Sequence, residues 1–327
     1  MKTLVLEYFE QLSGGEGQQK DNLLLIPLFL NWEIGRRNYL LLDEALAEGT
    51  LQVSEASKEG MVNNLIVVNR GKQPVLILDG EELVGAKQNR MVNATILIPP
   101  EGSLDIPVSC VERGRWRYES NHFQGSQVFG HSELRRTKAS RVAENLSQAR
   151  SFEADQHAVW EEIDRKQLSM DAHSTTDAIH DVYASYESEL ADFIAGLQPL
   201  EKQVGVGVFV SGIFNCLDIF SHPDVLKRLW NKLLGSYAME ALEMKNVKAS
   251  ISSATGIETV LKPLQGAEQE QYPSVGLGTD IRLHSISYIA AGLVFEEQVL
   301  HLAAFRNSET RQAKGGFAQP SHRRRVY

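Results

Sequence analysis

Cysteine is scarce in this sequence, which has two such residues, Cys110 and Cys216, and no CxxC spacing. This scarcity excludes a disulfide-rich scaffold, and two distant thiols are typical of a cytoplasmic protein that keeps its cysteines reduced. Long apolar runs are also missing, because the longest, 23–30 and 288–295, fall far short of the roughly 20 residues that a membrane helix needs. The sequence therefore predicts a cytoplasmic protein that does not span a membrane.

A surplus of positive charge is absent as well. Lys and Arg number 33 against 42 Asp and Glu, which makes the formal net charge −9. We therefore expect neither nucleic acid nor an anionic membrane as a partner. A secretory signal is not expected, because Glu7 interrupts the apolar stretch at the N-terminus. The nine histidines show no HExxH motif and no paired Cys–His spacing, so no metal site is predicted.

What the sequence does contain is the composition of a globular protein, with 43% hydrophobic and 23% charged residues. Short strand-like segments fill the first third, where the continuous apolar run 23–30 indicates a strand covered on both faces. Strand-like sequence returns in a hairpin around Ser211-Gly212 and again over 280–305. We predict an α+β fold, in which a β-rich sandwich or a rolled antiparallel sheet carries several long amphipathic helices.

Three of these helices can be placed. Residues 132–166 have helical spacing with a narrow apolar stripe, and residues 179–197 trace one apolar face. Pro223 opens the third helix, since proline suits the first turn.

A chain of 327 residues exceeds one typical domain, so we expect one large fold or two packed parts. The composition divides it into four successive segments. These are a β-rich part over 1–130, a helical segment over 131–200, an α+β part over 201–310 and a flexible tail over 311–327.

The densest polar run inside strand-like sequence is 79–90, DGEELVGAKQNR. Asp79-Gly80 is a two-residue hairpin signal, and 81–84 reads as the returning strand. Alternation along that strand places Glu81 and Glu82 on opposite faces. If both faces are covered, at least one carboxylate is buried and needs a cation, which Lys87 or Arg90 can supply.

The second half of this run offers hydrogen-bond donors. Gly85-Ala86 permits a close approach of the backbone to a ligand, and the four side chains that follow suit phosphate or ribose oxygens. These are Lys87, Gln88, Asn89 and Arg90. The alternative is a structural ion-pair network that holds a bulged strand.

A second polar cluster covers 109–116, SCVERGRW. Cys110 and Glu112 share a strand face, but no histidine is near enough in sequence to activate the thiol, which favours a buried, inert cysteine. Arg115 and Trp116 can pair with or stack on a planar anionic ligand. The alternative is a tryptophan that closes the end of a sheet.

The motifs 79–90 and 106–116 (IPVSCVERGRW), with looser matches at 206–212 and 301–305, resemble the ARG-and-rhodanese-phosphatase-superfamily-associated protein domain, a family of unknown function. The resemblance covers most of the chain. Genes of this family lie beside those of ADP-ribosylglycohydrolases and rhodanese-phosphatase proteins, so the resemblance implies a role near ADP-ribose or nucleotide processing. It supplies no catalytic residue.

Three functional hypotheses follow, and none assigns a cofactor. The first is a cytoplasmic protein that binds an anionic small molecule such as an ADP-ribose derivative. The second is a hydrolase or transferase acting on ADP-ribosyl or nucleotide substrates, with Glu81 or Glu82 as acid or base and Lys87 as a further catalytic candidate. The third is an interaction scaffold that docks through helix 132–166. The ligand-binding candidates are Asp79, Glu82, Lys87, Gln88, Asn89, Arg90, Cys110, Glu112, Arg115 and Trp116.

Overall fold

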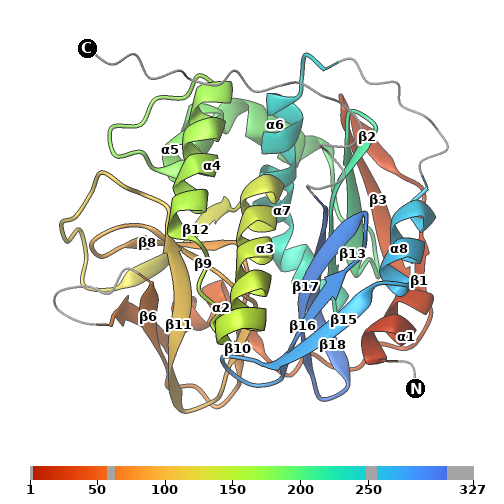
Figure 1. Ribbon diagram of the computed structural model, residues 1–327, viewed down its shortest axis with the longest axis horizontal. Coiled ribbons are helices and arrows are strands. Elements are labelled where there is room, and N and C mark those ends of the chain that lie inside the picture. The colour runs from red at the N-terminus through yellow and green to blue at the C-terminus, as the bar shows by residue number, and fades with distance from the viewer. Residues whose placement is uncertain (1–2, 57–62, 248–255, 308–327) are drawn as a thin grey trace.

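Helices lie between two β-rich regions in the structure (Figure 1), a computed structural model that describes residues 3–56, 63–247 and 256–307. The predicted α+β class is confirmed. The expected tail, 311–327, lies outside the described residues. No helix in the described ranges is long and apolar enough to cross a membrane. The helices are α1 (Leu4–Glu10), α2 (Leu42–Ala47), α3 (Ser132–Ala149), α4 (Gln156–Ser169), α5 (Ile179–Ser185), α6 (Glu187–Gly196), α7 (Pro223–Glu243) and α8 (Glu258–Gln265).

The largest sheet in the described part of the chain has nine antiparallel strands and joins the beginning of the sequence to its end. β3 pairs with β13, with Leu23 opposite Val210. The predicted hairpin around Ser211-Gly212 is confirmed, because β13 pairs with β14. In spatial order the strands are β1 (Leu12–Gly14), β3 (Leu23–Leu30), β13 (Gly205–Val210), β14 (Ile213–Phe220), β18 (Gln298–Arg306), β17 (Tyr288–Phe295), β16 (Thr279–His284) and β15 (Glu268–Pro273), with β2 (Gln18–Lys20) beside β3.

Both faces of this sheet are covered, which explains the continuous apolar run in β3. α1 and α8 pack on one face, at the right of Figure 1, where Phe9 and Leu261 share an apolar cluster with Leu28 of β3. The other face of the sheet belongs to a second cluster, in which Leu23 and Leu25 lie with side chains of the central helices. Residues of one short strand therefore contribute to two separate cores.

The other β-rich region contains a six-stranded sheet and a three-stranded sheet, which enclose a third apolar core. The six-stranded sheet is rolled, as predicted: its edge strands approach each other, and Gln52 Nε2 lies 3.1 Å from His122 Nδ1. Its strands are, in order, β12 (Phe123–Phe129), β8 (Glu81–Gly85), β9 (Arg90–Val92), β11 (Gly102–Cys110), β6 (Asn64–Asn69) and β5 (Leu51–Glu55). The smaller sheet consists of β10 (Ile96–Ile98), β7 (Val75–Ile77) and β4 (Leu40–Leu41).

The turn at Asp79-Gly80 exists, but the predicted hairpin is wrong. Gly80 has a φ of 94°, and the N–H of Glu81 donates to the carbonyl of Leu78 at 3.2 Å. The strands on either side do not pair with each other, because β7 pairs with β10 and β4, whereas β8 pairs with β9 and β12. A tight turn reverses the chain locally without deciding which strands become neighbours, and this one moves the chain from one sheet to another.

The single helix predicted over 132–166 is also wrong. α3 ends at Arg150, which has a φ of 53°, and α4 begins after Asp155, whose carboxylate accepts the N–H of His157 at 2.9 Å. The two helices pack against each other, so the docking helix of the scaffold hypothesis does not exist as one element. The helix expected over 179–197 is similarly divided into α5 and α6 at Tyr186.

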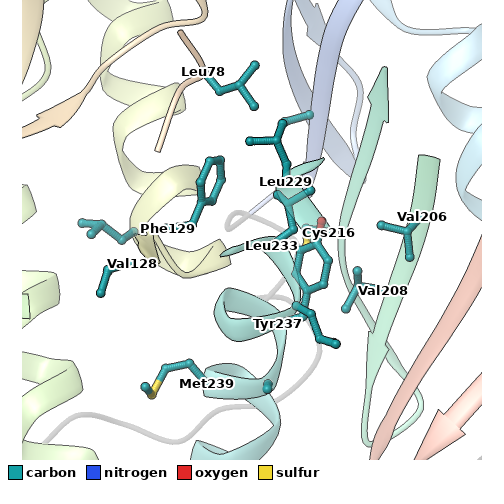
Figure 2. Packing of buried hydrophobic residues seen from close by; sticks show 14 of the residues in the cluster. Leu78, Val128, Phe129, Val206, Val208, Cys216, Leu229, Leu233, Tyr237 and Met239 are labelled. Carbon is teal, nitrogen blue, oxygen red and sulfur yellow. The ribbon is translucent and has the colours of Figure 1, made fainter. Parts of the chain in front are cut away.

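α7 packs between the two β-rich regions, against β12 of one and β13 and β14 of the other. It begins at Pro223, as predicted, and the His222 ring accepts the N–H of Asp224 at 3.1 Å. Figure 2 shows Leu233 and Tyr237 of this helix between side chains of the two β-rich regions. The neighbours labelled there include Leu78, Phe129, Val206 and Val208. The two regions therefore share one apolar core through α7.

Beside this core lies a buried ion pair between α3 and β14. Arg135 donates to both carboxylate oxygens of Asp218, at 3.0 and 2.7 Å, and both side chains are 0% exposed. Tyr237 donates to Asp218 at 2.6 Å, and His301 Nε2 lies 3.2 Å from the same carboxylate. Burial alone raises the pKa of Asp218, but the charges and hydrogen bonds of Arg135 and His301 together outweigh it, so the pKa lies well below its usual range.

The same network reaches the turn between β7 and β8. Lys138 Nζ lies 3.0 Å from Asp79 Oδ1, and Arg135 Nε lies 3.9 Å from the other Asp79 oxygen. The backbone N–H of Asp79 donates to Thr95 Oγ1 at 3.2 Å, and this hydroxyl lies 2.8 Å from Nδ1 of His301. We call these residues, together with Asp218 and Tyr237, the central network. It joins both β-rich regions to α3 and α7.

Replacing Arg135 by Met is expected to destabilise the protein by about 3–5 kcal/mol, because two buried carboxylates lose their guanidinium partner. Urea unfolding followed by circular dichroism measures the change. The matched control is Arg141→Met on the same helix. It breaks the ion pair of Arg141 with Glu144, whose side chains are 45% and 55% exposed, and is expected to lower the free energy of unfolding by less than about 1 kcal/mol. If both variants lost the same small amount of unfolding free energy, the central network would not be important for the stability of the fold.

Candidate functional site

The predicted site residues divide among three places in the structure. Asp79 belongs to the central network, and Glu81 and Glu82 lie on opposite faces of β8 with separate partners. The remaining eight gather where β5, β8 and β11 end and β9 begins. We call this group, with the neighbouring Glu55 and Tyr118, the Arg90 cluster. Its members are Glu55, Lys87, Gln88, Asn89, Arg90, Cys110, Glu112, Arg115, Trp116 and Tyr118.

Arg90 is the most deeply buried cation of this cluster, with a side chain that is 0% exposed. It stands opposite Cys110 on β11 because β9 and β11 pair there. Its Nη1 donates to Gln88 Oε1 at 2.9 Å and contacts Cys110 Sγ at 3.1 Å. Nε and Nη2 have no hydrogen-bond partner among the described residues, and Nη2 lies 4.0 Å from Glu55 Oε1. Buried donors of this kind are normally satisfied, so they indicate a missing acceptor.

Arg115, by contrast, is fully engaged by the protein itself. It donates to Glu112 at 2.8 and 2.6 Å, to the carbonyl of Ala86 at 2.9 Å and to Asn89 Oδ1 at 3.0 Å. Burial alone raises the pKa of Glu112, but the hydrogen bonds and charge of Arg115, together with the hydrogen bond from the N–H of Asn89, outweigh it and lower the pKa. These contacts hold the connection between β8 and β9 in place. Arg115 and Glu112 therefore support the cluster.

Gly85, which was expected to admit a ligand near the backbone, contacts another part of the chain. Its φ is 116°, and a Cβ there would lie 2.5 Å from Ser120 Oγ. The same hydroxyl accepts the N–H of Ala86 at 2.9 Å. The group that lies close to the backbone of Gly85 is thus the Ser120 side chain.

Two aromatic side chains lie beside the buried arginine at the protein surface. Trp116 is 50% exposed and Tyr118 is 51% exposed. Lys87 Nζ lies 5.0 Å from the Trp116 ring centroid and 5.2 Å from that of Tyr118, and Arg90 Cζ lies 6.0 Å from the Trp116 centroid. The cluster thus combines two cations with an aromatic surface. Tyr118 was not among the predicted residues, although it follows Trp116 by two positions.

Cys110 has the properties of a protonated thiol. Its side chain is buried, and burial raises the pKa of the thiol above its ordinary value despite the charge of Arg90. Sγ lies 2.9 Å from Gln88 Oε1 and 3.2 Å from the carbonyl of Glu112, so the S–H can donate to either. These contacts agree with the buried, inert cysteine expected from the sequence.

Glu81 is paired with a cation that sequence reasoning did not foresee. Lys232 Nζ of α7 lies 3.5 Å from Glu81 Oε1 and 2.5 Å from Asp43 Oδ2. The N–H of Leu78 also donates to Glu81 at 2.9 Å. Burial raises the pKa of Glu81, and the charge of Lys232 opposes this shift. The expectation that Lys87 or Arg90 neutralises the glutamates of β8 is wrong, because a helix distant in sequence supplies the cation.

Glu82 forms a dyad with His180, the first-turn histidine of α5. Glu82 Oε2 lies 2.9 Å from His180 Nδ1; the glutamate side chain is 0% exposed and the histidine 43%. The hydrogen bond that His180 makes to the Glu82 carboxylate raises the pKa of the imidazole, although partial burial opposes the shift. A buried carboxylate that orients a half-exposed imidazole is a common arrangement in acid–base catalysis. No local pattern signals the dyad, since its members are 98 positions apart.

In the described ranges, no group of three or more His, Cys, Asp or Glu side chains is placed to hold a metal ion. The fold and these sites define an α+β protein in which a central network joins two β-rich regions and a polar, aromatic cluster closes one rolled sheet. The chain belongs to the ARG and Rhodanese-Phosphatase-superfamily-associated Protein domain family (ARPP-1), whose model matches residues 11–305. This confirms the resemblance noted from the motifs. No curated protein and no solved structure was found to match the chain.

Replacing Glu82 by Gln is expected to lower the pKa of His180, because the hydrogen bond that raises it loses its charge. A raised pKa in the folded state means that the pair stabilises the fold below the ordinary pKa of histidine, and this contribution disappears as pH rises through the raised value. NMR titration of the imidazole resonances measures the pKa. Glu268→Gln on β15 is the control, and an unchanged His180 titration in Glu82→Gln would refute the dyad.

Proposed function

We propose that the protein binds a small anionic ligand of the nucleotide type, such as an ADP-ribose derivative, at the Arg90 cluster. The observation that carries this proposal is Arg90 itself, a wholly buried guanidinium with two N–H-bearing nitrogens that have no partner in the described part of the chain. Charged donors of this geometry suit phosphate and carboxylate oxygens. The family's association with ADP-ribosylglycohydrolases, implied by the motif resemblance, favours a ligand that contains ADP-ribose.

The aromatic pair supports the nucleotide part of the proposal. Half-exposed Trp116 and Tyr118 present ring surface to solvent, and stacking of a base on an aromatic ring is worth roughly 1–3 kcal/mol. Lys87 and Arg90 lie within 6.0 Å of the Trp116 centroid, close enough for a phosphate near the stacked base to meet positive charge. The local charge favours an anion, because Arg115 is matched by Glu112, whereas the guanidinium of Arg90 lies 4.0 Å from Glu55 without a bidentate carboxylate partner among the described residues.

A simpler explanation for the geometry of Arg90 is a bound water molecule. One water between Nη2 and Glu55 Oε1, which are 4.0 Å apart, would satisfy both groups without any ligand. Binding measurements separate the two explanations. If Arg90 is satisfied by a structural water alone, the protein is not expected to bind nucleotides.

A second candidate function is hydrolysis or group transfer, and the Glu82–His180 dyad is the observation that favours it. Since the Glu82 side chain is 0% exposed, His180 is the member that can exchange a proton with a substrate. Glu82 would then act as a positioning residue. Product formation from ADP-ribosylated or nucleotide substrates tests this function. The expected result is turnover that is lost in His180→Ala, and absence of turnover with every substrate would remove this candidate.

Isothermal titration calorimetry with ADP-ribose, AMP and inorganic phosphate tests ligand binding. We expect heat with ADP-ribose and a loss of affinity of about ten- to a hundredfold in Arg90→Gln, which corresponds to about 1.4–2.8 kcal/mol for a lost charged hydrogen-bonding group. Arg90→Lys is expected to recover part of this loss, since it keeps the charge but not the planar fork. Trp116→Ala is expected to weaken ADP-ribose and leave phosphate unaffected.

The control for this experiment is Arg141→Gln, which removes an arginine from the exposed face of α3 and is expected to leave binding unchanged. Circular dichroism establishes that each variant is folded. Absence of heat with all three compounds in folded wild-type protein would refute the proposal, and so would equal affinities in wild type and Arg90→Gln.

A further inference from the structure

A cavity of about 420 Å³ lies where α3 begins and α7 ends, and it shares no residue with the Arg90 cluster or the Glu82–His180 dyad. Its walls come from five elements: the first turn of α3, the turn and start of the β13–β14 hairpin, the end of α7, α4 and the end of β18. This volume falls within the range of sites that hold small organic ligands.

Most of the charged side chains around this cavity are paired with one another. Glu133 Oε1 lies 2.5 Å from Arg136, and Glu243 Oε1 lies 2.5 Å from Arg165. Glu240 accepts the N–H of Glu133 at 3.2 Å and also lies 3.3 Å from Lys166 Nζ. The three acids are therefore neutralised by neighbouring cations or by the start of α3, and they do not make the cavity a site for a cation.

Three polar groups in the cavity wall remain without such partners among the described residues. Ser132 is 3% exposed and its hydroxyl has no hydrogen-bond partner, and the same holds for the buried Oδ1 of Asn215. Arg306 forms no ion pair within the described ranges. Asn215 and Arg306 are close, because β14 and β18 are antiparallel and the adjoining residues Cys216 and Phe305 face each other.

Two of these groups suit the recognition of an anion, because the Ser132 hydroxyl and the Arg306 guanidinium can each donate to a carboxylate, sulfonate or phosphate oxygen. The Asn215 Oδ1 is an acceptor, and it suits a hydroxyl or N–H group of the same ligand. Ser132 is also the first residue of α3, a helix of 18 residues, so the partial positive charge of the helix N-terminus adds to the attraction.

The rest of the wall is apolar, and part of it is open to solvent. Ile213 is 41% exposed and Val247 is 50% exposed, and Val210, Phe214 and Met244 line the cavity with them. Exposed aliphatic side chains beside a cavity gain free energy when a ligand covers them. A ligand that fits this wall therefore has an apolar body as well as an anionic group.

We propose that this cavity is a second ligand site, which takes a small organic anion with an apolar body. Arg306 and Ser132 contact its anionic group, and the side chains of the β13–β14 turn and the end of α7 contact its apolar part. The site is independent of the nucleotide-type ligand proposed for the Arg90 cluster, because the two share neither residues nor the chemistry of the ligand body.

Fluorescence titration of the full chain with 1-anilinonaphthalene-8-sulfonate, an aromatic sulfonate, tests this site. We expect saturable enhancement at one site and at least tenfold weaker binding in Arg306→Gln and in Val247→Asp. Arg141→Gln on the exposed face of α3 is the matched control and is expected to bind like wild type. Octanoate is expected to displace the dye, and inorganic phosphate at the same concentration is not.

Because this dye also binds loosely packed proteins, each variant is first tested for a cooperative thermal transition. Two variants on different walls keep the test decisive if one of them does not fold. The proposal is overturned if folded wild-type protein shows no saturable enhancement, or if folded Arg306→Gln and Val247→Asp bind the dye as tightly as wild type. Displacement by phosphate as efficient as by octanoate would overturn the requirement for an apolar body.

Discussion

The ion pair of Arg135 with Asp218 is the interaction on which the arrangement of the two β-rich regions depends. A buried guanidinium is stabilised by a carboxylate partner and by aromatic faces, and this one lies between the Phe129 and Phe305 rings, with Cζ 4.8 and 5.2 Å from their centroids. The apolar contacts of α7 stabilise the packing of the two β-rich regions but are not directional, so they do little to fix the relative orientation of the regions. The central network fixes that orientation, because its hydrogen bonds and ion pairs form only when the Asp79 turn, the helices α3 and α7 and the strands β14 and β18 are in their native positions.

The Arg90 cluster differs from the central network in one respect that matters for function. In the central network the Arg135 guanidinium has a bidentate carboxylate partner, whereas Arg90 is bonded through Nη1 alone. Both arginines are equally buried. The described residues thus supply a bidentate carboxylate to Arg135 and leave Nε and Nη2 of Arg90 without a hydrogen-bond partner. That contrast, more than the density of polar residues in 79–90, distinguishes a candidate binding site from a structural one.

Sequence reasoning succeeded where the determinants are local and failed where they are distant. The strand over 23–30, the hairpin at Ser211-Gly212 and the start of α7 at Pro223 depend on neighbouring residues, and all three were predictable. The partners of Asp79, Glu81 and Glu82 come from α3, α7 and α5, which are distant in sequence. The spacing of residues within 79–90 therefore could not predict them. The break at Arg150 was missed because polar, helix-compatible residues on both sides conceal it.

The pairing of β3 with β13 has a consequence for how the chain is made. β3 leaves the ribosome early, but its partner β13 and the neighbouring strands β14 and β18 follow only after residue 204. Until then β3 can pair only with the short strands β1 and β2, and the edge that later pairs with β13 stays open. Unpaired strand edges of this kind are prone to associate with other chains. Synthesis of this protein therefore contains a long interval in which one edge of this N-terminal strand is unpaired.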